Sequence, residues 1–239
     1  MMQEVPAIEQ GEVQVWCARV DDAAVKAAVG LLNEEEQARM ERMRLGIARH
    51  EFVVGRALLR VLAGAATACG PREVTIGVGE HGKPRVESVE FSVAHSHGLV
   101  VLALCREAAL GVDVEWVERE IEALEIARST FAPGEAKRIE QATEGAERAR
   151  AFFAVWTRKE AIVKAHGQGL TIPLESFEAP EGDAEQAVEL VVKGDAQWLY
   201  VRGLDVGEGF AGALAAGVKG LKLRKVEVVG EALKKLLTA

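Results

Sequence analysis

A repeated order of secondary structure constrains this chain most: a strand, a long helix and several short strands are predicted twice, before and after about residue 108. In the first half, alternation of apolar and polar residues predicts a strand over residues 12–20, and apolar spacing predicts a helix over residues 47–66. In the second half, the corresponding segments are residues 110–116 and 147–165. This repetition indicates an internally duplicated protein of mixed helices and strands.

The remaining patterns predict shorter elements. Asn33 followed by Glu36 is typical of a helix N-terminus, and Gly70-Pro71 ends the first long helix. Shorter strands are expected over residues 74–78, 91–93, 99–105, 187–192, 198–204, 209–216 and 225–229. Shorter helices are expected over residues 121–129, 133–141 and 231–237.

The composition is that of an ordinary globular protein, with 49% hydrophobic and 28% charged residues. The formal net charge of −8 excludes the overall basic field that is typical of nucleic-acid binding. Three widely spaced cysteines argue against a disulfide framework or a zinc knuckle and favour a reducing compartment. The first residues lack the pattern of a signal peptide, and the most apolar run, residues 98–105, is too short to span a membrane. We therefore expect a cytoplasmic protein without nucleic-acid or membrane partners.

Residues 110–116, Leu-Gly-Val-Asp-Val-Glu-Trp, are the first segment with groups suited to chemistry. Because side chains on a strand alternate between faces, Asp113 and Glu115 point the same way, roughly 7 Å apart. Two carboxylates on one face are able to bind a hard cation. A half-exposed strand with a solvated outer face has the same pattern, so the segment alone leaves both interpretations open.

The second segment is a helix predicted around residues 152–164, in which charges interrupt an apolar stripe. The positions of that stripe at helical spacing are Phe152, Val155, Trp156, Lys159, Glu160 and Val163. A charge on such a face is costly unless it is paired or binds a metal. Lys164 follows Glu160 by one turn, close to the same face. A surface pair of Glu160 with Lys164, or a lysine stem that reaches solvent from the edge of the stripe, explains the pattern equally well.

Three further segments carry groups that suit phosphate. Residues 92–98, Ser-Val-Ala-His-Ser-His-Gly, place His95 and His97 at a break between strands, where they suit phosphate or a transition metal. Residues 79–84 hold Lys83 in a turn rich in glycine and proline, which suits the capture of an anion. Three arginines fall near one helix face: Arg49, Arg56 and Arg60. Guanidinium groups favour phosphate, although a solvated surface explains each of these segments as well.

The order and separation of these motifs are more specific than any one of them. The runs GKP, FSVAHS, GVDVE and WTRKEAIVKAHGQGL follow one another within residues 33–176, with about forty residues between the last two runs. This order resembles the Sfp-type 4′-phosphopantetheinyl transferases. The resemblance implies an α/β (α+β) fold of two similar lobes with pseudo-twofold symmetry, each a small, mostly antiparallel sheet packed with a long helix. The lobes are expected at residues 1–108, with the nucleotide-binding residues, and 109–239, with the metal-binding and catalytic residues.

The resemblance also implies an activity, the transfer of the 4′-phosphopantetheine arm of coenzyme A to a serine of an apo acyl or peptidyl carrier protein, with release of 3′,5′-ADP. In this family pattern Asp113, Glu115 and Glu160 bind Mg²⁺. Catalysis is implied for Asp113, for Glu160 as the general base and for Lys164 as the group that stabilises the diphosphate. The residues implied to contact coenzyme A are Arg49, Arg56, Lys83, His95 and Lys164.

Two positions depart from the family pattern. Ala94 stands where a serine is frequent, which removes one hydroxyl donor to phosphate, and Ser92 or Ser96 is the candidate substitute. Gln168 stands where a lysine is common, so a positive contact is expected to be missing there.

Two other functions are compatible with the same residues, a carboxylate-metal phosphohydrolase and a non-catalytic coenzyme A-binding protein. The intact acidic set argues against the second of these. We expect the carrier protein to dock on residues 118–147, which join the two acidic motifs. We also expect a monomer, because an internally duplicated chain does not need to dimerise.

Overall fold

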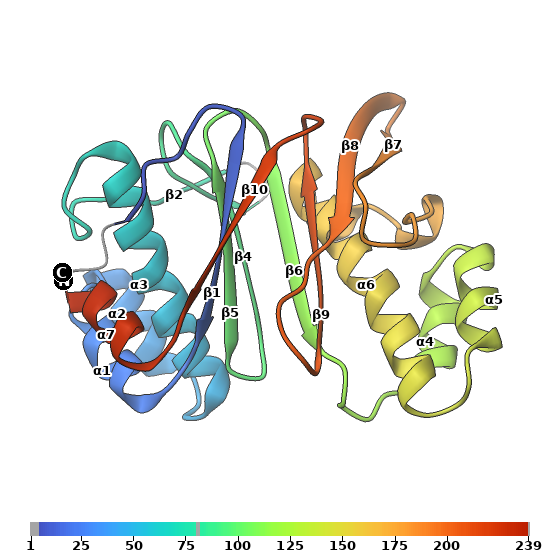
Figure 1. Ribbon diagram of the computed structural model, residues 1–239, viewed down its shortest axis with the longest axis horizontal. Coiled ribbons are helices and arrows are strands. Elements are labelled where there is room, and N and C mark those ends of the chain that lie inside the picture. The colour runs from blue at the N-terminus through green and yellow to red at the C-terminus, as the bar shows by residue number, and fades with distance from the viewer. Residues whose placement is uncertain (1–4, 80–81, 239) are drawn as a thin grey trace. The chain divides into compact units, whose positions relative to one another are not determined.

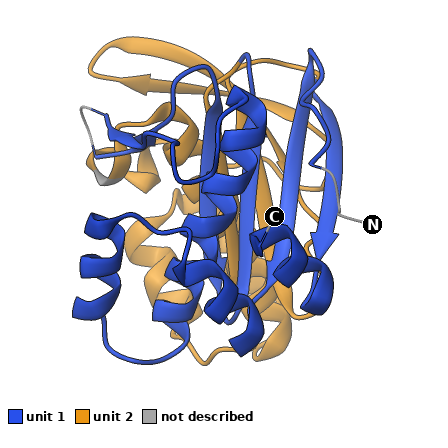
Figure 2. Ribbon diagram, turned by 90° about the vertical axis from the view of Figure 1, so that its left-hand side faces the viewer, with its two compact units in different colours: residues 1–107, 221–239 blue, residues 108–220 orange. Residues whose placement is uncertain are grey.

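A computed structural model describes residues 5–79 and 82–238 of the chain. The chain divides into two compact units, one of residues 1–107 together with 221–239 and one of residues 108–220 (Figure 2). Among the helices in the described part of the chain, none combines the length and the apolar composition that crossing a bilayer requires.

The first unit is built on a four-stranded sheet in the order β10-β1-β5-β4. Its strands are β1 (Glu12–Arg19), β4 (Glu90–Ser96), β5 (Leu99–Cys105) and β10 (Lys222–Val228). β1 pairs with β10 in parallel, whereas the β1–β5 and β4–β5 pairs are antiparallel. All seven residues of β5 are buried, which explains its continuous apolar run, Leu-Val-Val-Leu-Ala-Leu-Cys.

Helices pack on this sheet, and the longest of them approaches it closely. α3 (Ile47–Thr67) has 21 residues, and a Cβ atom added at its Gly55 would lie 3.5 Å from Val100 of β5. The other elements of the unit are α1 (Asp22–Val29), α2 (Glu34–Arg42), α7 (Gly230–Thr238) and the two-residue strands β2 (Gly77–Val78) and β3 (Pro84–Arg85). α7 contacts both α1 and α3, so the C-terminal helix closes the core of this unit (Figure 1).

The second unit has an antiparallel sheet in the order β6-β9-β8-β7, and α6 packs against β6, β9 and β8 (Figure 1). The strands are β6 (Leu110–Trp116), β7 (Gln186–Val192), β8 (Asp195–Gly203) and β9 (Phe210–Ala216). The helices are α4 (Ala123–Thr130), α5 (Pro133–Gln141) and α6 (Ala146–His166), with short 3₁₀ turns η1 (Gly169–Thr171) and η2 (Leu174–Ser176). α6 has 21 residues, as α3 has.

The predicted α/β (α+β) class is confirmed, because each unit has a mostly antiparallel sheet packed with one long helix. The division of the chain differs from the expected lobes at the C-terminus. Residues 221–239 belong with the first unit, since β10 pairs with β1 and the Lys222 N–H donates to the Gly11 carbonyl at 2.8 Å. The expected second lobe, residues 109–239, contained them.

Two local predictions also differ from the structure, and one helix was not predicted. The expected break after residue 93 is shorter, because β4 continues to Ser96 and only two residues turn the chain. Those residues, His97 and Gly98, both have positive φ values, 47° and 78°, as a tight hairpin turn requires. Of the strand expected over residues 74–78, only the last two residues form one. α1 was not expected, although Asp21 caps it by accepting from the Ala24 N–H at 2.7 Å.

Candidate active site

The carboxylate face of β6 is the face that α6 covers. Alternation along β6 places Gly111, Asp113 and Glu115 on one side of the strand. A Cβ atom at Gly111 would lie 1.9 Å from the Ala161 carbonyl oxygen and 2.5 Å from the Ala165 nitrogen, so no side chain fits there. The glycine of the GVDVE motif therefore lets the backbone of α6 rest on the strand, which brings the helix next to the two acidic residues.

Lys164, in the last turn of α6, contacts this acidic face directly. Its Nζ donates to Asp113 Oδ1 at 2.7 Å and to the Val112 carbonyl at 3.1 Å. Asp113 is 7% exposed, and its second oxygen, Oδ2, is buried without a hydrogen-bond partner among the described residues. A buried carboxylate oxygen of this kind is costly to leave unpaired, which points to a missing ligand.

The carboxyl groups at this face are electrostatically coupled. Burial raises the pKa of Asp113 to about 7; the Lys164 ammonium opposes that rise, and Glu115 and Glu160 add to it. Burial also raises the pKa of Glu160, again opposed by Lys164 and increased by Glu115. Asp113 and Glu160 thus share one lysine, and their repulsion by Glu115 favours the arrival of further positive charge.

The donor set fits a hard cation, because all its candidate ligands are oxygens and one of them is the orphaned Asp113 Oδ2. Protein cations hold these oxygens in the structure: Arg119 Nη1 lies 3.4 Å from Glu115 Oε2, and Lys164 pairs with Asp113. Within residues 5–79 and 82–238, no group of three or more His, Cys, Asp or Glu side chains is close enough to hold a metal ion. A cation bound by all three carboxylates would therefore have to compete with Arg119 and Lys164.

Lys159, the other charge predicted on the apolar stripe, has a structural role. It is 0% exposed, its Nζ lies 2.7 Å from Glu135 Oε2, and it also donates to the Leu174 and Phe177 carbonyls. Glu135 in turn accepts from the Ala179 N–H at 2.8 Å. The neighbours Lys159 and Glu160 therefore differ in function: the first ties α6 to α5 and the chain after η2, and the second belongs to the acidic face.

The apolar part of the stripe packs beside Lys159. The rings of Phe152 and Phe131 stack with centroids 5.2 Å apart, and Phe152 stacks on Trp156 at 5.8 Å. These contacts join α6 to the end of α4. The stripe predicted from helical spacing is thus a core contact with the helices of this unit.

In the first unit, two of the predicted nucleotide-binding residues have defined partners. His95 Nδ1 lies 3.0 Å from Glu51 Oε2, and 44% of the histidine side chain is exposed. Arg56 Nε lies 3.5 Å from Glu36 Oε1, and burial lowers the pKa of Arg56. Arg60 has a structural role, because it is 1% exposed and donates to Glu36 and to the Pro71 and Val74 carbonyls.

The other two predicted nucleotide-binding residues lie at element ends. Arg49 is half-buried in the first turn of α3. Lys83 directly precedes β3, and its carbonyl accepts from the Gly79 N–H at 2.8 Å. The neighbouring Glu80 and His81 lie outside the described residues. The structure therefore places the four candidates on α3, at the end of β4 and at the start of β3.

The two departures from the family pattern lie in different surroundings. Ala94 is buried, and alternation along β4 places it with Ser92 and Ser96 on the face opposite His95. These serines are thus poor substitutes for a hydroxyl beside the histidine. Gln168 directly precedes η1, where its carbonyl accepts from Thr171 Oγ1 at 3.0 Å.

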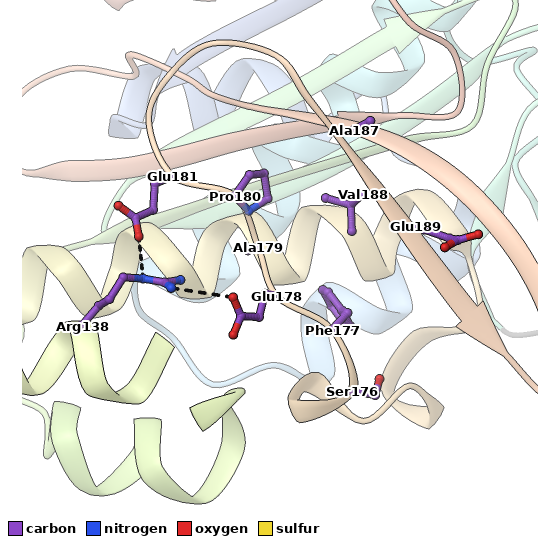
Figure 3. A pocket seen from close by; sticks show the side chains of 10 residues that line it. All are labelled: Arg138, Ser176, Phe177, Glu178, Ala179, Pro180, Glu181, Ala187, Val188 and Glu189. Carbon is purple, nitrogen blue, oxygen red and sulfur yellow. Dashed lines mark ion pairs between the residues drawn. The ribbon is translucent and has the colours of Figure 1, made fainter. Parts of the chain in front are cut away.

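Described residues of the second unit line hollows at two places on its surface. One, of about 540 Å³, lies between α5, the chain after η2 and β7, and Figure 3 shows Arg138 reaching Glu178 and Glu181 across it. Its described lining includes none of the predicted catalytic residues. The other, of about 900 Å³, is lined by residues 117–122 and by Gly145, Ala146, Ala149 and Arg150. This second hollow borders the acidic face, because Arg119 in its lining pairs with Glu115.

Comparison with known proteins identifies the family. The family model of the 4′-phosphopantetheinyl transferase superfamily matches residues 109–215, a range that contains the acidic face and α6. A phosphopantetheinyl transferase from Thraustochytrium sp. is 30% identical over 210 residues, which cover 79% of this chain and 73% of that relative. The chain belongs to the phosphopantetheinyl transferase family. The order of motifs predicted this family correctly.

Other members of the phosphopantetheinyl transferase family are similarly distant. The 4′-phosphopantetheinyl transferase Sfp of Bacillus subtilis is 26% identical over 171 residues, covering 70% of this chain and 74% of Sfp. The match to a relative from Synechocystis sp. covers 66% of this chain and 66% of that relative. The match to a second 4′-phosphopantetheinyl transferase of Bacillus subtilis covers 59% of this chain and 63% of that relative. Their identities to this chain are 32% and 30%.

Proposed function

We propose that this protein transfers the 4′-phosphopantetheine arm of coenzyme A to a serine of an apo acyl or peptidyl carrier protein and releases 3′,5′-ADP. The observation that carries the proposal is the convergence of Asp113, Glu160 and Lys164 where α6 rests on β6, in a member of this family. The relatives are named phosphopantetheinyl transferases. The two alternatives, a phosphohydrolase and a non-catalytic binding protein, gain no support from the family match.

We assign the proton transfer to Glu160 and the diphosphate contact to Lys164. Burial raises the pKa of Glu160, and a carboxylate with a raised pKa is a stronger base towards a serine hydroxyl. The Lys164 ammonium is rigidly placed, with two of its hydrogens donated to Asp113 and the Val112 carbonyl. We assign to this ammonium the stabilisation of the charge that develops on the leaving diphosphate of coenzyme A.

Asp113, Glu115 and Glu160 are the residues that would hold Mg²⁺. When bound, the ion would supply positive charge that neutralises the diphosphate. The support for this assignment is the all-oxygen donor set, the mutual repulsion of the carboxyl groups and the orphaned Asp113 Oδ2. On the same proposal, Arg49, Arg56, Lys83 and His95 contact the nucleotide phosphates. The exposed side chain of His95 is consistent with such a role.

The remaining assignments concern partners and location. The hollow lined by residues 117–122 supports our placement of the carrier protein on residues 118–147, because it borders Glu115 through Arg119. A monomeric state, a cytoplasmic location and the lack of nucleic-acid or membrane partners stay predictions.

The test is a mass assay of carrier modification. The protein is incubated with coenzyme A, Mg²⁺ and a panel of apo acyl and peptidyl carrier proteins, and intact masses are measured. We expect the phosphopantetheine increment on the carrier serine and an equal amount of 3′,5′-ADP, both strongly reduced in Asp113→Asn and Glu160→Gln. Release of 3′,5′-ADP without any carrier modification would instead indicate a hydrolase.

A further inference from the structure

We infer that Glu51 is a positioning residue, which orients the His95 ring for a phosphate group of the nucleotide. The inference rests on the proposed function, in which His95 contacts the nucleotide phosphates. Both residues belong to the first unit, Glu51 on α3 and His95 on β4. Neither the spacing of the motifs nor the family match assigns a role to Glu51.

The Glu51 carboxylate uses both oxygens, one on the ring and one on the turn that follows it. Oε2 lies 3.0 Å from His95 Nδ1, and Oε1 accepts from the Gly98 N–H at 2.6 Å. The Gly98 carbonyl is fixed as well, since it accepts from the Val20 N–H at 2.8 Å. Glu51 is 4% exposed, so its position is set by packing.

This geometry determines which ring nitrogen a ligand can use. An ionised carboxylate only accepts hydrogen bonds, so the Nδ1 of His95 carries the proton. Nε2 is then the ring nitrogen left for a ligand. A phosphate oxygen needs a donor, and the ring becomes one at Nε2 when it takes up a second proton. The resulting imidazolium lies between the Glu51 carboxylate and the phosphate, and charge-assisted hydrogen bonds of this kind are the strong ones.

A purely structural role for Glu51 makes a different prediction. The contact with the Gly98 N–H is enough to tie α3 to the β4–β5 turn. In that case the Glu51 carboxylate would not affect how the His95 ring binds a ligand. Removal of the carboxylate would then lower the stability of the protein without a specific effect on nucleotide binding.

The test uses Glu51→Gln, because glutamine keeps the shape of the side chain but has one acceptor oxygen for two donors. The ligand is 3′,5′-ADP, which carries the nucleotide phosphates without the pantetheine arm, and its Kd is measured by titration calorimetry at neutral pH. We expect a Kd about tenfold higher in Glu51→Gln, a matching rise in KM for coenzyme A, and kcat within about twofold. Glu90→Gln, an exposed glutamate at the start of β4, is the matched control and should bind as the wild type does.

Two further measurements connect the effect to His95. In the double variant Glu51→Gln/His95→Gln we expect a Kd close to that of His95→Gln alone, because the two residues act on one contact. Nitrogen-15 NMR of the wild-type His95 ring should show the proton on Nδ1. A purely structural role for Glu51 would not connect the position of this proton with nucleotide binding.

The outcomes separate this inference from the proposed function. Wild-type protein that neither binds 3′,5′-ADP nor modifies a carrier would remove the proposed function. An active wild type whose Kd is unchanged by Glu51→Gln or by His95→Gln would overturn the inference alone. If Glu51→Gln does not fold, a wild-type ring without a proton on Nδ1 overturns it equally.

Discussion

Gly111 of β6 and Ala161 of α6 are so close that a Cβ atom added to the glycine would lie 1.9 Å from the alanine carbonyl oxygen. Real side-chain contacts never reach that separation, so any larger residue at position 111 must push the helix off the strand. The carboxylates of β6 and the charged groups of α6 are brought together by this contact. The GVDVE motif therefore combines two requirements, acidic groups for chemistry and a glycine for backbone packing.

Gly111→Ala is expected to lower the free energy of unfolding by about 3 kcal/mol. The added methyl group would clash with backbone atoms of α6, which cannot move aside as a flexible side chain can. For a chain of this size, that corresponds to a Tm lower by about 6–12 °C in a thermal melt. Gly217→Ala is the control, since a Cβ there meets its nearest neighbour at an ordinary 3.7 Å. Equal Tm values for the two variants would show that α6 does not rest on the strand as described.

Lys164→Met is expected to lower kcat by about 100-fold in the carrier assay. The variant loses the proposed diphosphate contact, and it also removes the ammonium that opposes the raised pKa of Asp113. Asp113 then stays protonated at neutral pH and is a poorer cation ligand. Lys219→Met, at an exposed lysine of the same unit, should retain wild-type turnover. A fully active Lys164→Met protein would remove this lysine from the site.

The stability of the wild type is expected to fall as the pH rises from about 4 to 7. The folded-state pKa of Asp113, about 7, lies above its ordinary value of 3.8, so the folded protein binds this proton more tightly than the unfolded chain. The stabilisation is fully present below about pH 4 and is lost as the pH rises through 7. Urea unfolding at pH 5, 6, 7 and 8 should show this loss, on the order of 1–3 kcal/mol, in the wild type and much less of it in Asp113→Asn. Parallel curves for the two proteins would contradict it.

Mg²⁺ is expected to stabilise the folded protein in the absence of any substrate. At ten times its Kd, a ligand that binds only the folded state adds about 1.4 kcal/mol, or about 3–6 °C in Tm. The rise should be reversed by EDTA and absent in Asp113→Asn, and the exposed-residue control Glu189→Gln should behave as the wild type. If Mg²⁺ leaves the wild-type Tm unchanged at millimolar concentrations, the cation must need the coenzyme A diphosphate to bind.

Lys159→Met is expected to destabilise the protein by about 3–5 kcal/mol, because it leaves the Glu135 carboxylate buried without its partner. Adding Glu135→Gln to this variant should recover part of the loss, since the uncompensated charge is then removed. Urea unfolding of the two single variants and the double variant measures this coupling. Strictly additive losses would mean that the two groups do not form the ion pair.

Much of the fold was predictable from the sequence, because its elements carry strong local signals. Alternation gave the bounds of β6 correctly, and Asn33 with Glu36 forms the capping box that begins α2. The parallel pairing of β10 with β1 had no local signal, since it joins residues 210 positions apart, such as Glu12 and Lys222. The placement of residues 221–239 in the first unit therefore could not be inferred from a local pattern.

The candidate site was predictable in its residues and less so in their contacts. Periodicity marked Lys159 and Glu160 together as misplaced charges on one stripe. It could not separate them, because the partner of Lys159 is Glu135 on another helix. Glu51 was missed for a similar reason: it is one acidic residue in a polar helical turn, and its significance comes from packing against the β4–β5 turn.

The pairing of β10 with β1 has a consequence for synthesis of the chain on the ribosome. The second unit, residues 108–220, is complete before the first unit has its last strand and α7. Until residues 222–228 emerge, β1 presents an open sheet edge with unpaired N–H and carbonyl groups, which invites association with other strands. The nascent protein must therefore protect β1 while the second unit folds, and the sheet of the first unit is completed only after β10 has been made.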